Sequence, residues 1–169
     1  MAILDIKKHP DPVLRQKARP VAQVDTRIKR LLDDMVDTMY AARGIGLAAP
    51  QVGISQRVIV VDIGDGPLRV VNPRLTLLGD EEEQATEGCL SIPGILGDVW
   101  RSVKLTVRGL DEHGKPLRLD AEGLLARVFQ HEVDHLDGQL FIDIAENVRE
   151  ATAEDLEDED PEHQALQHE

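Results

Sequence analysis

The sequence predicts an α+β protein in which antiparallel or mixed β-sheets pack around a central helix. Two long segments, 25–43 and 121–138, carry apolar residues at helical spacing. Residues 102–108 instead alternate between apolar and polar side chains, and the turn sequence DEHG at 111–114 follows, as in an antiparallel hairpin. Helical and extended segments do not alternate regularly along the chain, which argues against a doubly wound parallel sheet.

Each expected element follows from a local pattern of this kind. In chain order we expect a short helix at 11–18, a long helix at 25–43, strands at 57–63, 68–78 and 102–110, a hairpin partner at 116–119 and the central helix at 121–138. Gly44 is a natural C-cap for the first long helix, and Gly138 supplies a stop for the second. After residue 144 the apolar pattern thins, which predicts a C-terminal helix or tail.

The length of 169 residues suits one domain, which we place at residues 1–145, followed by an acidic tail at 146–169 that is partly helical or frayed. The tail holds ten acids and one arginine, so it carries −9 of the net charge of −13 and leaves −4 for the rest. An acidic tail argues against direct nucleic-acid binding, because phosphate contacts need Lys and Arg.

Targeting signals and disulfides are absent from the sequence pattern. The N-terminal residues contain no apolar run of signal-peptide length, and no stretch reaches membrane-spanning length. The single cysteine, Cys89, cannot form an internal disulfide. These features predict a protein of the reducing cytoplasm without membrane contact.

The most informative motif is His-Glu-Val-Asp-His at residues 131–135. On a helix, residues four apart lie on one face with Cβ atoms about 5–6 Å apart, so both imidazoles could share one metal ion. Glu132 would lie beside that ion, where it could take a proton from an activated water molecule. The alternative is a helix with two satisfied polar core residues, because a short motif also occurs by chance.

A catalytic metal site usually needs a third protein ligand besides His131 and His135. The metzincin pattern is excluded, since no histidine follows at the required spacing. A thermolysin-like site could use Glu154, nineteen residues beyond His135. The remaining candidate is Cys89, which is a buried filler, a reactive thiol or a ligand, and Gly88 beside it leaves room for close approach by another element.

Three blocks of the sequence together resemble the peptide deformylase family. They are GIGLAAPQ at 44–51, EGCLS at 87–91 and QHEVDHLDG at 130–138, which are similar to the family patterns GxGxAAxQ, EGCxS and QHExDHxxG. The resemblance extends from about residue 3 to about residue 145. It implies a metal-dependent hydrolase that removes the N-formyl group from the formylmethionine of newly synthesised proteins and releases formate.

The resemblance implies that Cys89, His131 and His135 are the metal ligands. One thiolate and two neutral imidazoles suit a borderline-soft divalent ion. In the family this ion is generally Fe(II), with Zn(II), Ni(II) or Co(II) as substitutes, whereas the ligand types alone would suggest zinc.

Catalytic roles are implied for three further residues. Glu132 would be the general base and would then pass its proton to the departing amine. The side-chain amide of Gln51 and the backbone N–H of Leu90 would stabilise the oxyanion.

The glycine-rich block is expected to bind the substrate. Gly44, Ile45 and Gly46 would let a peptide run close to the backbone and pair with it as an added strand, without reading its side chains. Ile45, Leu96 and Phe129 are candidates by position for an apolar methionine pocket, although each could be ordinary core.

Two acids lie next to the expected ligands in sequence. Glu87 and Asp134 could bind Arg101 or orient a histidine from outside the metal site.

The leading prediction is therefore a deformylase whose partners are N-formylmethionyl nascent peptides, with transient docking on a basic ribosomal protein as a further expectation. Two other hypotheses stay open at this point. One is a metallopeptidase whose third ligand is Glu154. The other is a metal-binding regulatory or stress protein in which Cys89 senses oxidation and no turnover occurs.

Overall fold

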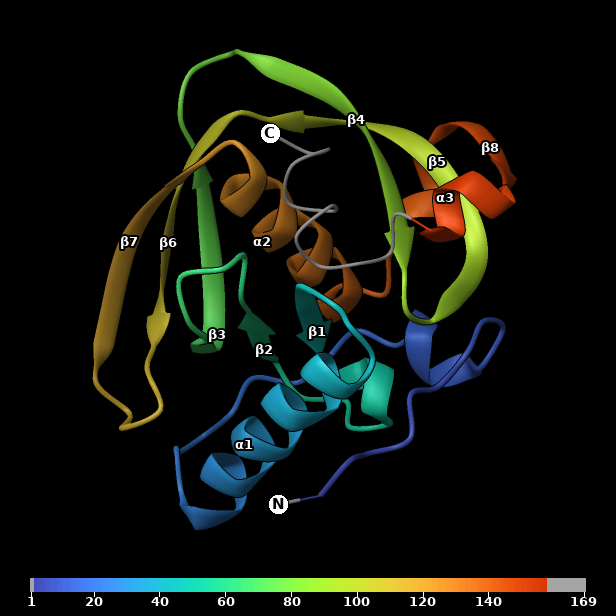
Figure 1. Cartoon of the computed structure of the whole chain (residues 1–169). Helices are drawn as coiled ribbons and strands as arrows, with labels where there is room; N and C mark the ends of the chain where they lie inside the picture. The colour runs from blue at the N-terminus through green and yellow to red at the C-terminus, as the bar shows by residue number, and fades with distance from the viewer. Residues whose placement is uncertain (1, 158–169) are drawn as a thin grey trace.

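The computed structural model describes residues 2–157 as two antiparallel sheets arranged around a central helix (Figure 1). In chain order the elements are η1 (Pro12–Arg15), α1 (Thr26–Ala41), β1 (Gly46–Ala48), η2 (Ala49–Val52), β2 (Val58–Val61), β3 (Leu68–Leu77), β4 (Glu82–Cys89), β5 (Ile92–Ser102), β6 (Lys104–Leu110), β7 (Pro116–Glu122), α2 (Leu124–Leu136), η3 (Phe141–Asp143), β8 (Glu146–Glu150) and α3 (Ala153–Glu157). Within this part of the chain, no helix combines the length and apolar character needed to cross a membrane.

The two sheets differ in size. The larger sheet has five strands in the order β1-β2-β3-β6-β7, and the smaller has three in the order β4-β5-β8. Every pairing between these named strands is antiparallel. The chain leaves the larger sheet after β3, forms the β4–β5 hairpin and returns as β6. The expected α+β architecture is therefore confirmed.

Helix α1 covers one face of the larger sheet. Asp25 caps the helix, because its side chain accepts a hydrogen bond of 3.0 Å from the Ile28 N–H. The buried apolar stripe of the helix consists of Ile28, Leu31, Leu32, Met35, Val36 and Met39. This stripe packs in one cluster with Val58 and Val60 of β2.

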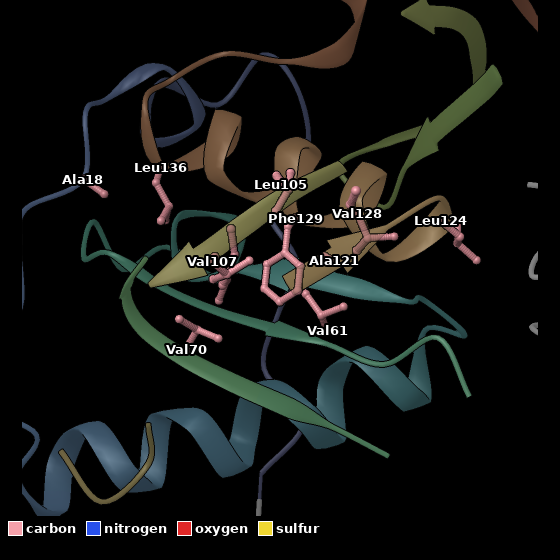
Figure 2. Close-up of a cluster of buried hydrophobic side chains, with 13 residues drawn as sticks. Ala18, Val61, Val70, Leu105, Val107, Ala121, Leu124, Val128, Phe129 and Leu136 are labelled. Carbon is pink, nitrogen blue, oxygen red and sulfur yellow. The ribbon is translucent and has the colours of Figure 1, made fainter. Parts of the chain in front are cut away.

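Helix α2 covers the opposite face of the same sheet and lies in the middle of the molecule (Figure 1). Ile59 and Val61 alternate with the α1-facing residues of β2 and belong to the α2 cluster. Phe129 of α2 is fully buried, and Figure 2 shows its ring directed from the helix toward the sheet. Strand β2 is thus buried on both faces, which explains its uninterrupted apolar sequence.

The end of α2 lies against the N-terminal segment. Gly138 has a φ of 76°, and a Cβ at this position would lie 2.6 Å from the carbonyl oxygen of Arg15. The Ala18 N–H donates a hydrogen bond of 2.8 Å to the Leu136 carbonyl. Both the backbone conformation and the close approach therefore require glycine here.

Some local elements differ from the sequence-based expectation. The helix expected at 11–18 is only the four-residue turn η1, because Gln16 at its end is already extended with a ψ of 142°. The central helix begins at Leu124 rather than at Ala121, since residues 121 and 122 complete β7. Local patterns do not predict β4 or β5. The sequence of β4, EEQATEGC, is acidic and has few residues typical of strands. The two strands form by pairing with each other over most of their length.

The segment expected as a tail begins with a strand. Residues 146–150 form β8, which pairs with β5 so that Glu146 lies opposite Asp98 and Arg149 opposite Leu96. The short helix α3 follows. The acidic stretch that we expect to be frayed is 157–162. Its first residue ends α3, and 158–162 lie outside the described residues. The division of the chain at residue 145 remains a prediction.

We expect Phe129→Ala to lower the free energy of unfolding by about 3–5 kcal/mol, because it removes a fully buried ring from between helix and sheet. Urea denaturation followed by circular dichroism measures this change. Leu77→Ala is the control, since Leu77 is 55% exposed and its truncation should change the same quantity by no more than about 0.5 kcal/mol. Equal effects of the two substitutions would contradict the assigned core.

Candidate metal centre

Three potential metal ligands converge between the smaller sheet and the central helix. Cys89 is the last residue of β4, and His131 and His135 lie one turn apart on α2. One ligand atom from each lies within 4.8 Å of the other two, and Cys89 Sγ is 3.3 Å from His135 Nε2. Among residues 2–157, no other group of three or more histidine, cysteine or acidic side chains is this close. Glu154 is exposed on α3 and does not join the group.

The β4–β5 turn sets the position of the cysteine. Cys89 pairs with Ile92 across this tight turn, so its side chain is fixed by the hairpin. Gly88 precedes it, and a Cβ on Gly88 would lie 3.1 Å from Leu96 Cδ2. Glycine at this position therefore leaves room for the Leu96 side chain of β5, within the hairpin itself.

The chemistry of this donor set fits a divalent transition-metal ion. Burial lowers the pKa of His135 well below its ordinary value, which keeps the imidazole neutral and its lone pair available. A thiolate with two neutral imidazoles is a normal ligand set for Zn(II), Fe(II) and similar ions.

Glu87 orients the other histidine through a buried network. Its Oε1 atom is 2.8 Å from His131 Nδ1, which leaves Nε2 of the same ring free for an ion. Arg101 binds both oxygens of Glu87 at 2.9 Å and also donates to Asp134 at 2.6 Å. Burial alone would raise the pKa of Glu87, but its bonds with His131 and Arg101 hold that pKa well below its ordinary value. The expectation that Glu87 and Asp134 bind Arg101 is thus met.

A second buried arginine completes this network and was missed by sequence reasoning. Arg127 Nη1 donates to Glu87 Oε2 at 2.6 Å and to the Val99 carbonyl at 2.9 Å. Arg127 lies four residues before His131, so both stand on the same face of α2. An arginine on the otherwise apolar face of a buried helix is the signal that could have identified it, because such a charge needs a buried partner.

Glu132 lies at the centre without a neutralising partner. Its side chain is 4% exposed, and its Oε1 atom has no hydrogen-bond partner. Burial raises the pKa of Glu132 to about 7. Gly46 of β1 faces this carboxylate, and a Cβ there would overlap Glu132 Oε2 and come within 2.9 Å of Val128 Cγ1. Glycine is therefore necessary at this position to leave room for the acid.

Gln51 is held beside the cysteine. Its side chain is nearly fully buried, its Oε1 accepts a hydrogen bond of 2.9 Å from the Ala48 N–H, and its Nε2 is 3.6 Å from Cys89 Sγ. The Nε2 atom also donates to Ser91 Oγ at 3.2 Å, a partner that sequence reasoning did not identify. Leu90 occupies the turn between Cys89 and Ser91.

The residues expected to take part in catalysis, Glu132, Gln51 and Leu90, line one pocket of about 430 Å³. Gly44, Ile45 and Gly46, expected to bind the peptide, also line it, as does Leu96. Phe129 does not line it, because it lies two residues before His131 and points into the core. In place of Phe129, helix α2 lines the pocket with Val128 and Leu124, which lie three and seven residues before His131.

Comparisons with known proteins agree on one family. The family described as polypeptide deformylase matches residues 3–151. A peptide deformylase of Symbiobacterium thermophilum is 53% identical over 165 residues, covering 96% of this chain and 76% of that protein. One from Natranaerobius thermophilus is 56% identical over 149 residues, covering 88% of this chain and 96% of that protein.

Solved structures give the same result. The crystal structure of a peptide deformylase from Thermotoga maritima is similar with a TM-score of 0.84 and 45% identity, covering 86% of this chain and 99% of that one. A peptide deformylase from Synechococcus elongatus, solved in complex with actinonin, is similar with a TM-score of 0.83 and 48% identity, covering 87% of this chain and 81% of that one. Sequence and fold therefore agree over the region that contains the centre.

We expect Glu87→Gln to lower the free energy of unfolding by about 3 kcal/mol near neutral pH, because it leaves two buried arginines without a full counter-charge. The folded-state pKa of Glu87 is depressed, so its carboxylate stabilises the fold above the unfolded-state pKa of about 4.3. That contribution is lost as the pH falls toward the folded-state pKa. The difference between wild type and variant should therefore shrink from about pH 7 to about pH 3.

Urea denaturation at several pH values measures this difference. Glu122→Gln is a matched control. Glu122 is exposed and forms a long ion pair of 3.8 Å with Lys104 Nζ, so this substitution should have little effect on stability at any pH. A gap between wild type and Glu87→Gln that widens in acid would refute the depressed pKa.

Proposed function

This chain belongs to the polypeptide deformylase family and removes the N-formyl group from formylmethionyl nascent peptides, and we propose that the Cys89, His131 and His135 cluster holds its metal ion. The observation that carries this proposal is the convergence of these three ligand atoms within 4.8 Å, beside the buried carboxylate of Glu132. Exposed Glu154 contributes nothing to the cluster, which removes support from a metallopeptidase with that ligand.

We propose Fe(II) as the ion used by the enzyme, with Zn(II), Ni(II) or Co(II) as substitutes that the same ligands accept. When bound, such an ion polarises the formyl carbonyl and lowers the pKa of water. The protein's contribution is to hold one sulfur and two ring nitrogens on rigid elements.

Glu132 is the proposed general base and acid. A pKa of about 7 allows its carboxylate to take a proton from the attacking water and release it to the departing amine near neutral pH. Its position against Gly46 keeps the carboxylate next to the strand that we assign to substrate binding. Val128 packs at the same point and limits access of bulk water.

Gln51 and Leu90 are the proposed donors to the oxyanion. The Gln51 amide is fixed with its nitrogen toward Cys89, and the turn that contains Leu90 lies next to the same sulfur. Donors that are already oriented before the reaction stabilise developing negative charge at little cost in reorganisation.

Peptide binding is proposed to use the backbone of Gly44, Ile45 and Gly46. Strand β1 begins at Gly46 and is an edge strand of the larger sheet, so a peptide could extend the sheet there. Ile45, Leu96 and Val128 line the adjacent pocket and would accept the methionine side chain. Main-chain pairing suits an enzyme whose substrates share only their first residue.

Newly made chains are the substrate, so we propose that the enzyme works in the cytoplasm and docks transiently on a basic ribosomal protein. The acidic character of residues 146–169 favours a basic protein surface over RNA. Residues 1–145 are the proposed catalytic domain and 146–169 the proposed tail.

We expect Cys89→Ser and His131→Ala to lose at least about 90% of the bound metal after anaerobic purification, since each removes one of three protein ligands. Elemental analysis measures the metal content per chain. Glu154→Gln is the control and should keep a full complement. Metal loss in Glu154→Gln combined with metal retention in Cys89→Ser would show that the ligand set is wrong.

We expect Glu132→Gln to retain the ion but to lose about 10²- to 10⁴-fold in kcat, because it cannot accept the proton. Formate release from a formyl-Met peptide measures the rate, with the acetyl analogue as the specificity control. If the wild-type protein released no more formate than Glu132→Gln, as expected of a purely regulatory metal protein, the proposed mechanism would be overturned.

A further inference from the structure

We infer that Ser91 is a positioning residue for catalysis, which fixes the Gln51 amide so that one of its N–H bonds faces the reacting carbonyl. This inference rests on the proposed role of Gln51 as an oxyanion donor. It assigns a function to the last residue of the EGCLS block, which supplies neither a ligand nor a substrate contact in the site described above.

The side chains of Ser91 and Gln51 form a buried, hydrogen-bonded pair. Ser91 is 0% exposed and Gln51 is 1% exposed. Gln51 Nε2 donates to Ser91 Oγ at 3.2 Å, while Gln51 Oε1 accepts from the Ala48 N–H at 2.9 Å. Because Ala48 N–H is a donor, it fixes which end of the amide carries nitrogen. The two bonds together therefore define both the identity and the direction of the N–H groups.

The backbones of the same two residues are held by one extended segment near the N-terminus. The Lys7 N–H donates to the Gln51 carbonyl at 2.7 Å, and the His9 N–H donates to the Ser91 carbonyl at 2.8 Å. Residues 7 and 9 thus bridge η2 and the β4–β5 turn, which are far apart in sequence. This bridge keeps the serine hydroxyl and the glutamine amide at a fixed separation.

The number of N–H bonds on the Gln51 amide explains why its orientation matters for the reaction. A side-chain amide has two N–H bonds. One is donated to Ser91 Oγ at 3.2 Å, and the other is donated to Cys89 Sγ, 3.6 Å from the nitrogen. The bond to sulfur is the longer of the two, and its hydrogen is the one that would turn to a negatively charged oxygen formed beside the cysteine. Without the serine hydroxyl, the terminal amide torsion is broad and the N–H direction is no longer fixed.

The test is a double-mutant cycle on the metal-loaded, full-length enzyme. We expect Ser91→Ala to lower kcat for a formyl-Met peptide about tenfold, to change KM less than about twofold and to leave the metal content unchanged. In a Gln51→Ala background, Ser91→Ala should have no further effect on kcat, because it acts only through Gln51. Thr106→Val is the control for loss of a buried hydroxyl elsewhere, since Thr106 bonds Asp120 on the distant β6–β7 hairpin, and it should keep full activity.

A second measurement does not depend on turnover. In Zn(II)-loaded protein, NMR should show that the side-chain N–H protons of Gln51 exchange with solvent about tenfold faster in Ser91→Ala than in wild type. In Thr106→Val their exchange should be unchanged.

The outcomes separate the inference about Ser91 from the proposed role of Gln51. If Gln51→Ala lowers kcat but Ser91→Ala does not, the inference about Ser91 is wrong and the role of Gln51 stands. Additive losses in the double variant, or unchanged exchange of the Gln51 amide, would also overturn it. If Gln51→Ala keeps full activity, the proposed oxyanion role itself fails, and the inference fails with it.

Discussion

A carboxylate buried as deeply as that of Glu87 costs several kcal/mol in lost hydration unless it is fully paired, and the arrangement of this molecule provides those partners. Glu87 is on β4, Arg101 is on β5, and Arg127 and His131 are on α2. Their hydrogen bonds of 2.6 to 2.9 Å join the smaller sheet to the central helix. The same interaction engages His131 Nδ1 and leaves Nε2 for the proposed metal ion. In the proposed mechanism, stability and metal binding therefore both depend on one buried charge cluster.

The second constraint is steric, and it concerns how closely β1 approaches α2. Gly46 has no side chain, so the carboxylate of Glu132 can lie against the strand. Gly138 allows a similar approach between the end of α2 and the N-terminal segment. This segment also reaches Gln51 and Ser91 through the backbone bonds of residues 7 and 9. The proposed proton carrier and the proposed oxyanion donor are thus held on elements that pack directly on one another.

This arrangement explains how a motif shared with peptidases can serve a smaller reaction. The pair of histidines and Glu132 are the proposed ligands and base, a pattern found in other hydrolases with HExxH helices. The proposed third ligand, Cys89, comes from a tight hairpin close to the helix and not from a residue further along the chain. The pocket of about 430 Å³ places apolar Ile45 and Leu96 next to the centre.

Local sequence patterns predicted the long helices, most strands of the larger sheet and the spacing of His131, Glu132 and His135, because helical periodicity involves only residues a few positions apart. The resemblance to a known family chose the ligand role for Cys89 among its alternatives and added an oxyanion role for Gln51, and no local pattern relates either residue to α2. Strands β4 and β5 were not predicted, because the acidic sequence of β4 has little strand propensity of its own. Strand β4 forms through its pairing with β5.

The sequence by itself determined which helix carries the two histidines and the glutamate, since their relative positions follow from the helical repeat alone. Only the tertiary structure decided that Phe129 belongs to the core rather than to the pocket, that Arg127 pairs with Glu87 and that Ser91 holds Gln51. The last two of these contacts each join residues that are 40 positions apart in the chain. Their formation depends on how sheets and helices pack, which neither periodicity nor a short motif encodes.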